Sequence, residues 1–152
     1  MNDPLSIIRN YYRISENLAT AGQPTEGQFS IIRDEGFDVV INLAMADSPR
    51  ALPDEAALLE SLDLEYIHIP VNFAAPEIND LLRFNEAMHQ NNNKKCFVHC
   101  ALNWRVSAFI FLYRTLTGEM QPEEAMHDLQ AVWQPDATWQ AFIDAALEKK
   151  FE

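Results

Sequence analysis

The segment at positions 94–113 constrains the fold of this chain most, because its pattern predicts a buried strand, a tight loop and a buried helix in direct succession. Positions 96–98 form a short apolar run of strand-forming residues, as in a strand covered on both faces. Positions 106–116 are apolar on nearly every side, which is typical of a helix inside a domain, and Gly118 stands where such a helix would end. Only positions 100–105 remain between them, so we expect a thiol, Cys100, at the carboxyl end of a central strand, facing the start of the helix.

The expected position of Cys100 has chemical consequences for its thiol. The first turn of a helix presents unpaired backbone N–H groups, and together with the helix dipole they favour an anion. A cysteine at such a place is expected to be largely thiolate at neutral pH, and the same N–H groups would hold the oxygens of a tetrahedral anion. Arg105 adds a planar guanidinium that can bind two phosphate oxygens at once. The sequence therefore predicts a nucleophile, an anion cradle and a cation in one short segment.

The neighbours of Cys100 each allow a functional and a structural interpretation. We expect His99 to hydrogen-bond the loop and orient Cys100 rather than to transfer a proton. Ser107 either donates a hydrogen bond to the thiolate or caps the helix backbone, and Trp104 either walls the pocket or packs on an adjacent helix. Asn103 is expected to shape the loop, because asparagine tolerates left-handed backbone better than most residues.

The order of these residues resembles a known signature. The run from His99 and Cys100 to Arg105 and Ser107 is similar to the signature of cysteine-dependent protein tyrosine and dual-specificity phosphatases. That superfamily has five residues between cysteine and arginine, whereas four separate Cys100 from Arg105. The chain more closely resembles a bacterial family of small phosphatase-like proteins, whose short motifs recur here in the same order over nearly the whole chain. These motifs are Cys100-Ala101-x-Asn103-x-Arg105-Val106-Ser107-Ala108, Gly22-Gln23-Pro24, Ile41-Asn42-Leu43, His68-Ile69-Pro70-Val71 and Ala75-Pro76.

This resemblance implies a phosphatase that works through a cysteinyl-phosphate on Cys100. The residues that it implies around the substrate phosphate are Ala101, Leu102, Asn103, Trp104 and Arg105. The superfamily also uses an aspartate on a separate loop as general acid, a contribution of roughly 10²–10⁴ in rate. Asn72 stands where that aspartate is expected to meet the substrate, and an amide cannot donate a catalytic proton. The candidate substitutes are Asp47, Glu77 and Asp80.

The short spacing leaves two registers for the loop. In the first, the phosphate cradle is one residue shorter and Arg105 keeps the role of the signature arginine. In the second, Val106 occupies that position and Arg105 points about 100° away around the helix. The first is preferred, because Tyr113 then falls where related dual-specificity enzymes often have tyrosine.

Elsewhere apolar runs alternate with amphipathic segments, which predicts an α/β fold with a central, mostly parallel sheet of four or five strands flanked by helices. The expected strands lie at 12–14, 18–21, 37–43, 64–71 and 96–99, and the expected helices at 26–35, 54–62, 76–89, 106–116, 122–133 and from 136 toward Phe151. Thr25 and Gln28 fit a capping box, and Gly36 would end the helix that they begin. The inward residues of the 76–89 helix are expected to be Leu81, Leu82, Phe84 and Met88.

Two segments outside the signature need an interpretation. The long irregular segment 42–53 follows the carboxyl end of a strand, where open α/β sheets bind ligands, so it is either a binding loop or a simple surface connection. The string from Trp133 to Asp136 is similar in letters to the Trp-Pro-Asp loop of the phosphatases, but it follows the cysteine and has an extra residue. We expect only that Asp136 caps a helix.

Charge limits the partners of the chain. A net charge of −12 argues against nucleic acid and against an anionic membrane. The expected substrate, a phosphorylated small molecule or a phosphoprotein, must therefore be attracted by local positive potential. No His/Cys cluster has the spacing of a zinc site, and neither a metal nor a cofactor is expected. The sequence does not set the oligomeric state.

Length and cysteine usage indicate the class of protein. A chain of 152 residues has an ordinary one-domain size, and one phosphatase-like domain is expected over 1–152. No apolar run reaches the roughly 20 residues of a membrane span, and the beginning of the chain has no signal-peptide pattern. Two cysteines without such a signal indicate reduced thiols in the cytoplasm. Cys96 is expected in the core, about 13 Å from Cys100 along an extended strand and too far for a disulfide.

Three functions remain open at this point. The first is a cysteine-dependent phosphatase with weak activity toward aryl phosphates that have good leaving groups. The second is a catalytically impaired phosphatase-like domain that binds a phosphorylated or other anionic ligand. The third is rhodanese-like sulfur transfer, which uses a shorter cysteine loop. The structural alternatives are that Cys100 is a small core residue and that Arg105 is a surface arginine with an acidic partner.

Overall fold

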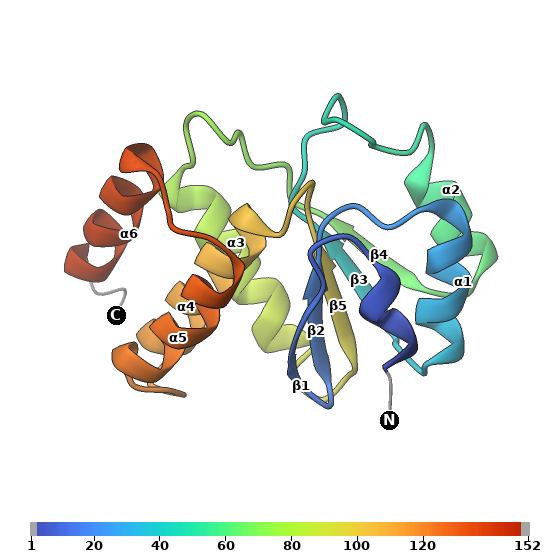
Figure 1. Ribbon diagram of the computed structural model, residues 1–152, viewed down its shortest axis with the longest axis horizontal. Helices are drawn as coiled ribbons and strands as arrows, with labels where there is room; N and C mark the ends of the chain where they lie inside the picture. The colour runs from blue at the N-terminus through green and yellow to red at the C-terminus, as the bar shows by residue number, and fades with distance from the viewer. Residues whose placement is uncertain (1–2, 150–152) are drawn as a thin grey trace.

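A five-stranded sheet forms the centre of the computed structural model, which describes residues 3–149 (Figure 1). The strands are β1 (Tyr12–Ser15), β2 (Leu18–Ala21), β3 (Val39–Asn42), β4 (Glu65–His68) and β5 (Cys96–His99). Their order across the sheet is β1-β2-β5-β3-β4, and only β1 runs antiparallel to its neighbour. The expected mostly parallel sheet is therefore confirmed, with β5 at its middle.

Helices cover both faces of the sheet, as Figure 1 shows. They are the 3-10 helix η1 (Pro4–Ile7) and the α-helices α1 (Glu26–Asp34), α2 (Glu55–Ser61), α3 (Ile78–Gln90), α4 (Trp104–Leu116), α5 (Pro122–Val132) and α6 (Ala137–Lys149). One apolar core joins the sheet to η1, α1 and α2, and a larger one joins it to α3, α4, α5 and α6. Among the described helices, none combines the length and the apolarity needed to cross a lipid bilayer.

Local signals account for the two helices that frame the site. At the start of α1, Thr25 and Gln28 form the predicted capping box, with hydrogen bonds of 2.9 and 3.2 Å. Gly36 follows α1 with a φ of 90°, a left-handed conformation that glycine adopts without steric cost. Helix α4 is buried along most of its length, which agrees with its nearly uninterrupted apolar sequence.

Some expected boundaries and one core assignment are wrong. Strands β3 and β4 are shorter than the segments that predicted them, although Leu43, Ile69 and Val71 beyond their ends still donate backbone hydrogen bonds to neighbouring segments. Leu82 is 42% exposed, whereas Leu81 and Phe84 are fully buried. One residue turns a helix by about 100°, so Leu82 does not share the inner face of Leu81. The short helix η1 was not predicted, and the expected end of the last helix near Phe151 lies outside the described residues.

Candidate active site

The candidate site lies at the carboxyl edge of the parallel strands. Cys100 follows the central strand β5, and its N–H donates to the carbonyl oxygen of Ala21 on β2 at 3.3 Å. On the other side, the N–H of Leu43 donates to the carbonyl oxygen of His99 at 2.9 Å. Ligands of open α/β sheets bind at this edge. The sheet therefore presents Cys100 between two neighbouring strands.

The loop after Cys100 turns sharply into α4 at Asn103. Asn103 is the N-cap of α4 and has a left-handed φ of 69°. Its buried side chain donates to the hydroxyl oxygen of Thr20 at 3.0 Å and to the carbonyl oxygen of Asn10 at 2.9 Å. Two distant segments therefore hold the turn that aims the start of α4 at the loop.

Cys100 and Arg105 line one cavity of about 200 Å³. The same cavity is lined by Ala101, Leu102, Trp104, Pro49 and Phe73. The backbone N–H groups of Ala101, Leu102, Trp104 and Arg105 donate no hydrogen bond to any residue in 3–149. All four residues line the cavity, so these N–H groups are candidate donors to an anion beside Cys100, and Arg105 adds a cation.

Arg105 faces this cavity from the first turn of α4 and is only 6% exposed. Its Nη1 donates to the carbonyl oxygen of Val71 at 2.8 Å, and its guanidinium lies 5.8 Å from the ring centre of Phe73. Within residues 3–149 no carboxylate forms an ion pair with it. Val106 is fully buried in the core and does not line the cavity. The structure therefore has Arg105, not Val106, beside Cys100, as in the first register.

An aromatic wall closes one side of the cavity. Trp104 stacks on Trp133 with ring centres 4.9 Å apart and planes within 2°, and Phe73 lies against both rings. The indole N–H of Trp139 donates to the carbonyl oxygen of Phe73 at 2.9 Å. Trp104 thus both lines the cavity and packs on its neighbour. The sequence carried no signal for Phe73, because only the tertiary fold brings it to the loop.

A buried hydrogen-bond chain supports the other side of the loop. His99 is fully buried; its Nε2 lies 2.7 Å from Oε2 of Glu55, and its Nδ1 lies 3.3 Å from the carbonyl oxygen of Cys100. Both partners accept hydrogen bonds, so the ring satisfies both contacts when each nitrogen carries a proton. The other carboxylate oxygen of Glu55 accepts from Nε2 of Gln23 at 2.9 Å. Sequence reasoning missed Glu55, because only the folded chain brings it to His99.

Burial raises the pKa of Glu55, but the hydrogen bond and the positive charge of His99, with the hydrogen bond of Gln23, outweigh it and hold that pKa below its ordinary 4.5. A depressed pKa means that this stabilising contribution is complete above pH 4.5 and is lost as the pH falls through the lowered value.

We expect the substitution Glu55→Gln to lower the free energy of unfolding at neutral pH by about 1–3 kcal/mol, because the ring of His99 loses a charged acceptor. The variant should also lose less stability than the wild type when the pH falls from about 5.5 to about 3.5. Urea unfolding at several pH values measures both effects. Glu60→Gln, on the exposed face of the same helix, is the control. Parallel pH curves for wild type and Glu55→Gln would contradict the assignment.

Five predicted site residues do not line this cavity: His99 and Asn103, which hold the loop as described above, and Ser107, Asp47 and Asn72. The hydroxyl of Ser107 donates to the carbonyl oxygen of Trp104 at 3.0 Å, and the residue lines a different cavity. Asp47 is exposed in the loop after β3. The side chain of Asn72 accepts a hydrogen bond from the N–H of Ala74 at 2.9 Å, which fixes its own loop. Among the described residues, no aspartate or glutamate lines the cavity.

The turn at Gly22 packs closely against the backbone of the loop after Cys100. Its N–H donates to the carbonyl oxygen of Arg9 at 2.7 Å, and the next N–H, of Gln23, donates to that of Ala101 at 3.0 Å. A Cβ atom on Gly22 would lie 2.4 Å from the carbonyl oxygen of Ala101. Only glycine allows this close approach of the two backbones.

Gly22→Ala is therefore expected to destabilise the protein by about 1–3 kcal/mol and to displace the loop. Gly27→Ala is the matched control, because a Cβ at Gly27 meets nothing within 4 Å. An alanine in that helical turn should raise stability by about 0.4–1 kcal/mol. Thermal and urea unfolding of both variants test the pair. Equal stability of the two would contradict the close approach.

Comparisons with known proteins find phosphatases that are similar to this chain. A family model described as "DSP-PTPase phosphatase fused to NAD+ Kinase" matches residues 12–144. A putative phosphatase (DUF442) from Shewanella putrefaciens CN-32 has a similar structure, with 34% identity, 97% of each chain covered and a TM-score of 0.86. No curated protein sequence matches the chain.

More distant structures share the fold. The catalytic domain of the PP-IP phosphatase SIW14 from S. cerevisiae, in complex with citrate, has 15% identity and a TM-score of 0.74 over 90% of this chain and 85% of its own. TpbA from P. aeruginosa, in complex with pTyr, has 15% identity and a TM-score of 0.71 over 99% of this chain and 94% of its own. Because the family model matches residues 12–144, most of the chain, the chain belongs to the DSP-PTPase family of cysteine-dependent phosphatases.

Proposed function

We propose that this protein hydrolyses phosphate monoesters, with Cys100 as the nucleophile and Arg105 as the cation that binds the phosphate. The observation that carries the proposal is the shared cavity of Cys100 and Arg105 at the start of α4. Arg105 has no acidic partner among the described residues, so its charge is available for an anion. A buried guanidinium with free donors binds phosphate oxygens in a fixed, two-pronged geometry.

In the proposed reaction, the thiolate of Cys100 attacks phosphorus and forms the S–P bond while the ester P–O bond breaks. The N–H groups of Ala101, Leu102, Trp104 and Arg105, with the guanidinium of Arg105, bind the three remaining oxygens as charge builds on them. Water then attacks phosphorus, the S–P bond breaks, and inorganic phosphate leaves with the thiolate restored. We assign to His99 and Asn103 the positioning of the loop, through Glu55 and Thr20 respectively.

We further propose that the leaving group departs without help from a carboxylate, because none lines the cavity in the described chain. The rate is then set by how well the leaving group carries negative charge. We expect kcat/KM for substituted phenyl phosphates to fall by about 3- to 10-fold for each unit rise in the pKa of the leaving phenol.

Steady-state rates over a series of such phosphates measure this dependence. A positioned acid would flatten it. The proposal would be contradicted if kcat/KM of the wild type depended only weakly on the pKa of the leaving phenol and that of Asp47→Asn depended on it strongly. Asp47 would then be the residue that transfers the proton.

A second function is favoured by the same missing carboxylate: capture of a phosphorylated ligand without turnover. In that case wild-type protein would show no hydrolysis that depends on Cys100, while Cys100→Ser would still bind inorganic phosphate in calorimetric titration. Hydrolysis that depends on Cys100 would exclude it.

The substrate is proposed by chemical class. The distant structural relatives include a PP-IP phosphatase and a protein solved with pTyr, so a phosphorylated small molecule and a phosphoprotein are both candidates. We place the reaction in the cytoplasm, where thiols stay reduced; both cysteines of the chain are free.

A further inference from the structure

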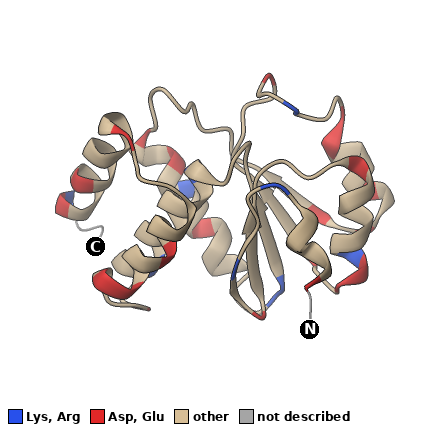
Figure 2. Ribbon diagram, in the orientation of Figure 1, with Lys and Arg blue, Asp and Glu red and all other residues tan. Residues whose placement is uncertain are grey.

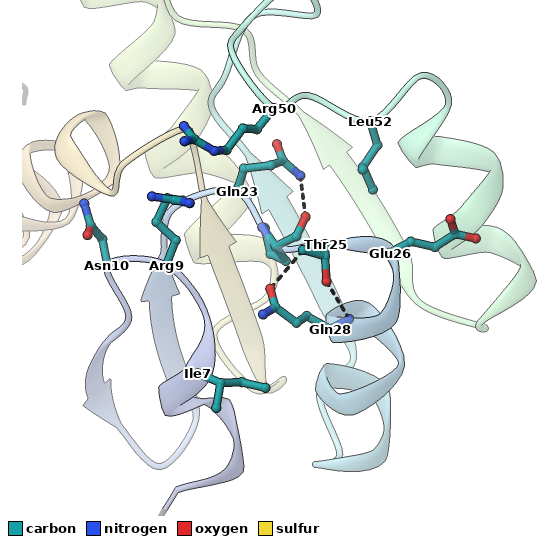
Figure 3. Close-up of a pocket in the computed structure, with 10 residues that line it drawn as sticks. Ile7, Arg9, Asn10, Gln23, Thr25, Glu26, Gln28, Arg50 and Leu52 are labelled. Carbon is teal, nitrogen blue, oxygen red and sulfur yellow. Dashed lines mark hydrogen bonds between the residues drawn. The ribbon is translucent and has the colours of Figure 1, made fainter.

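A second, larger cavity lies beside the loop at Cys100. It has a volume of about 590 Å³, which is within the usual range for small-molecule sites. It is lined by the segment before β1, the turn after β2, the start of α1 and the loop after β3 (Figure 3). The polar residues that matter for the argument are Arg9, Asn10, Gln23, Thr25 and Arg50.

Residues that line the second cavity form hydrogen bonds with the loop after Cys100 and with the turn beside it. The side chain of Asn10 donates to the carbonyl oxygen of Leu102 at 2.8 Å, and the carbonyl oxygen of the preceding residue, Arg9, accepts from the N–H of Gly22 at 2.7 Å. On the other side, Pro49 lines the cavity of Cys100 while the next residue, Arg50, lines the second cavity. The two cavities are therefore neighbours, separated by the loop itself.

The arginines without an acidic partner in residues 3–149 gather around the two cavities. Of the seven arginines in the sequence, four form ion pairs with carboxylates: Arg13, Arg33, Arg83 and Arg114. The other three are Arg9, Arg50 and Arg105, and none of them forms an ion pair with an acidic residue in 3–149. All three line the two cavities around the loop.

Two positively charged side chains share the second cavity. Figure 3 shows the guanidinium groups of Arg9 and Arg50 at the same end of the cavity, next to Gln23, whereas the carboxylate of Glu26 points away from them. Arg50 also has a left-handed φ of 66°, a conformation that costs free energy in residues other than glycine and is often kept at functional sites. Unpaired like charges in one place favour an anion between them.

The net charge of the protein strengthens this reasoning. Figure 2 shows acidic residues spread over the helices on both sides of the sheet, and the sequence carries a net charge of −12. An anionic substrate is repelled by the molecule as a whole, so its capture depends on local cations. Arg9 and Arg50 supply two of them in the cavity beside the loop.

We propose that the substrate is a small phosphate monoester that carries a second anionic group, a phosphate or a carboxylate, and that Arg9 and Arg50 bind this second group in the cavity beside the loop. The proposal rests on the proposed phosphatase function and specifies the substrate class of that site. A molecule with a single phosphate and no second anion leaves both guanidinium groups unpaired and binds more weakly.

The test uses alkylphosphonates, which resemble phosphate monoesters but are not hydrolysed. Inhibition of para-nitrophenyl phosphate hydrolysis is measured with monophosphonates and with bisphosphonates that carry a phosphonate at each end of a short, medium or long chain. We expect the bisphosphonate of best length to inhibit at about 10-fold lower concentration than its monophosphonate. The preference should shrink as salt is added, because both guanidinium groups are exposed.

Arg9→Gln combined with Arg50→Gln should bring this preference to within about twofold. Arg33→Gln, which removes the same charge from an exposed ion pair on α1, should keep it. The proposal is overturned if no bisphosphonate is preferred, if the preference survives in the double variant, or if Arg33→Gln lowers it equally.

Failure of the phosphatase function has a different signature. If wild-type protein hydrolyses no para-nitrophenyl phosphate through Cys100, the same phosphonates are compared by calorimetric titration of wild-type protein and of both arginine variants. A bisphosphonate preference that the double variant loses still supports the second anion site, and equal binding of the two phosphonates overturns it.

Discussion

Cys100→Ser is expected to lower kcat/KM for para-nitrophenyl phosphate by at least about 10³-fold. A serine hydroxyl is a much weaker nucleophile than a cysteine sulfur, so the nucleophile is lost although its shape is nearly kept. The fold should be unchanged, because the side chain is small and the cavity beside it has room. Purified variants are compared in steady-state assays, with far-ultraviolet circular dichroism as the check on folding.

Cys96→Ser is the matched control, because it makes the same change four residues earlier in the buried strand β5. Burial raises the pKa of the Cys96 thiol to about 11, so this cysteine is protonated and unreactive at neutral pH. We expect Cys96→Ser to keep activity within about threefold of the wild type. Comparable losses in the two variants would contradict the assignment of Cys100, and so would full activity in Cys100→Ser.

Arg105→Lys is expected to lower kcat/KM by about 10²–10³-fold, the usual loss when a donor to developing negative charge is removed. Nη1 of Arg105 is held by the carbonyl oxygen of Val71 at 2.8 Å, which leaves the other donors of the fork for the phosphate. A lysine keeps the charge, but it cannot hold Val71 and two phosphate oxygens in one plane.

Arg33→Lys, on the exposed surface of α1, controls for the general effect of the exchange and should leave kcat/KM within about twofold. Inorganic phosphate is titrated calorimetrically into a Cys100→Ser background to separate binding from turnover. A loss of less than about threefold in Arg105→Lys, with unchanged phosphate affinity, would show that the guanidinium does not touch the substrate.

The parts of the fold that were predictable are those that depend on neighbouring residues. Strand β2 lies where the short apolar run placed it, and the capping box of Thr25 and Gln28 begins α1. The strand, loop and helix around Cys100 follow from two apolar runs and the short segment between them. Apolar character alone also explains the wrong inward assignment of Leu82. Two adjacent leucines in a helix point in different directions, and their letters do not show which one turns outward.

Much of the candidate site was beyond sequence reasoning, because segments far apart in the chain build it. Phe73 and Pro49 line the cavity of Cys100, yet neither belongs to a periodic pattern. Glu55 lies 44 residues before His99 along the chain and meets it only in the folded protein. The short loop left Arg105 and Val106 as alternatives, and only the packing of Val106 into the core separates them.

The most direct test of the central claim is mass spectrometry of protein quenched in acid during turnover of para-nitrophenyl phosphate. An acid quench preserves a thiol-linked phosphate long enough to digest the chain and locate it. We predict one phosphoryl group on the peptide that contains Cys100, absent from Cys100→Ser and present in Cys96→Ser. Turnover without any phosphoryl group on Cys100 would contradict the account.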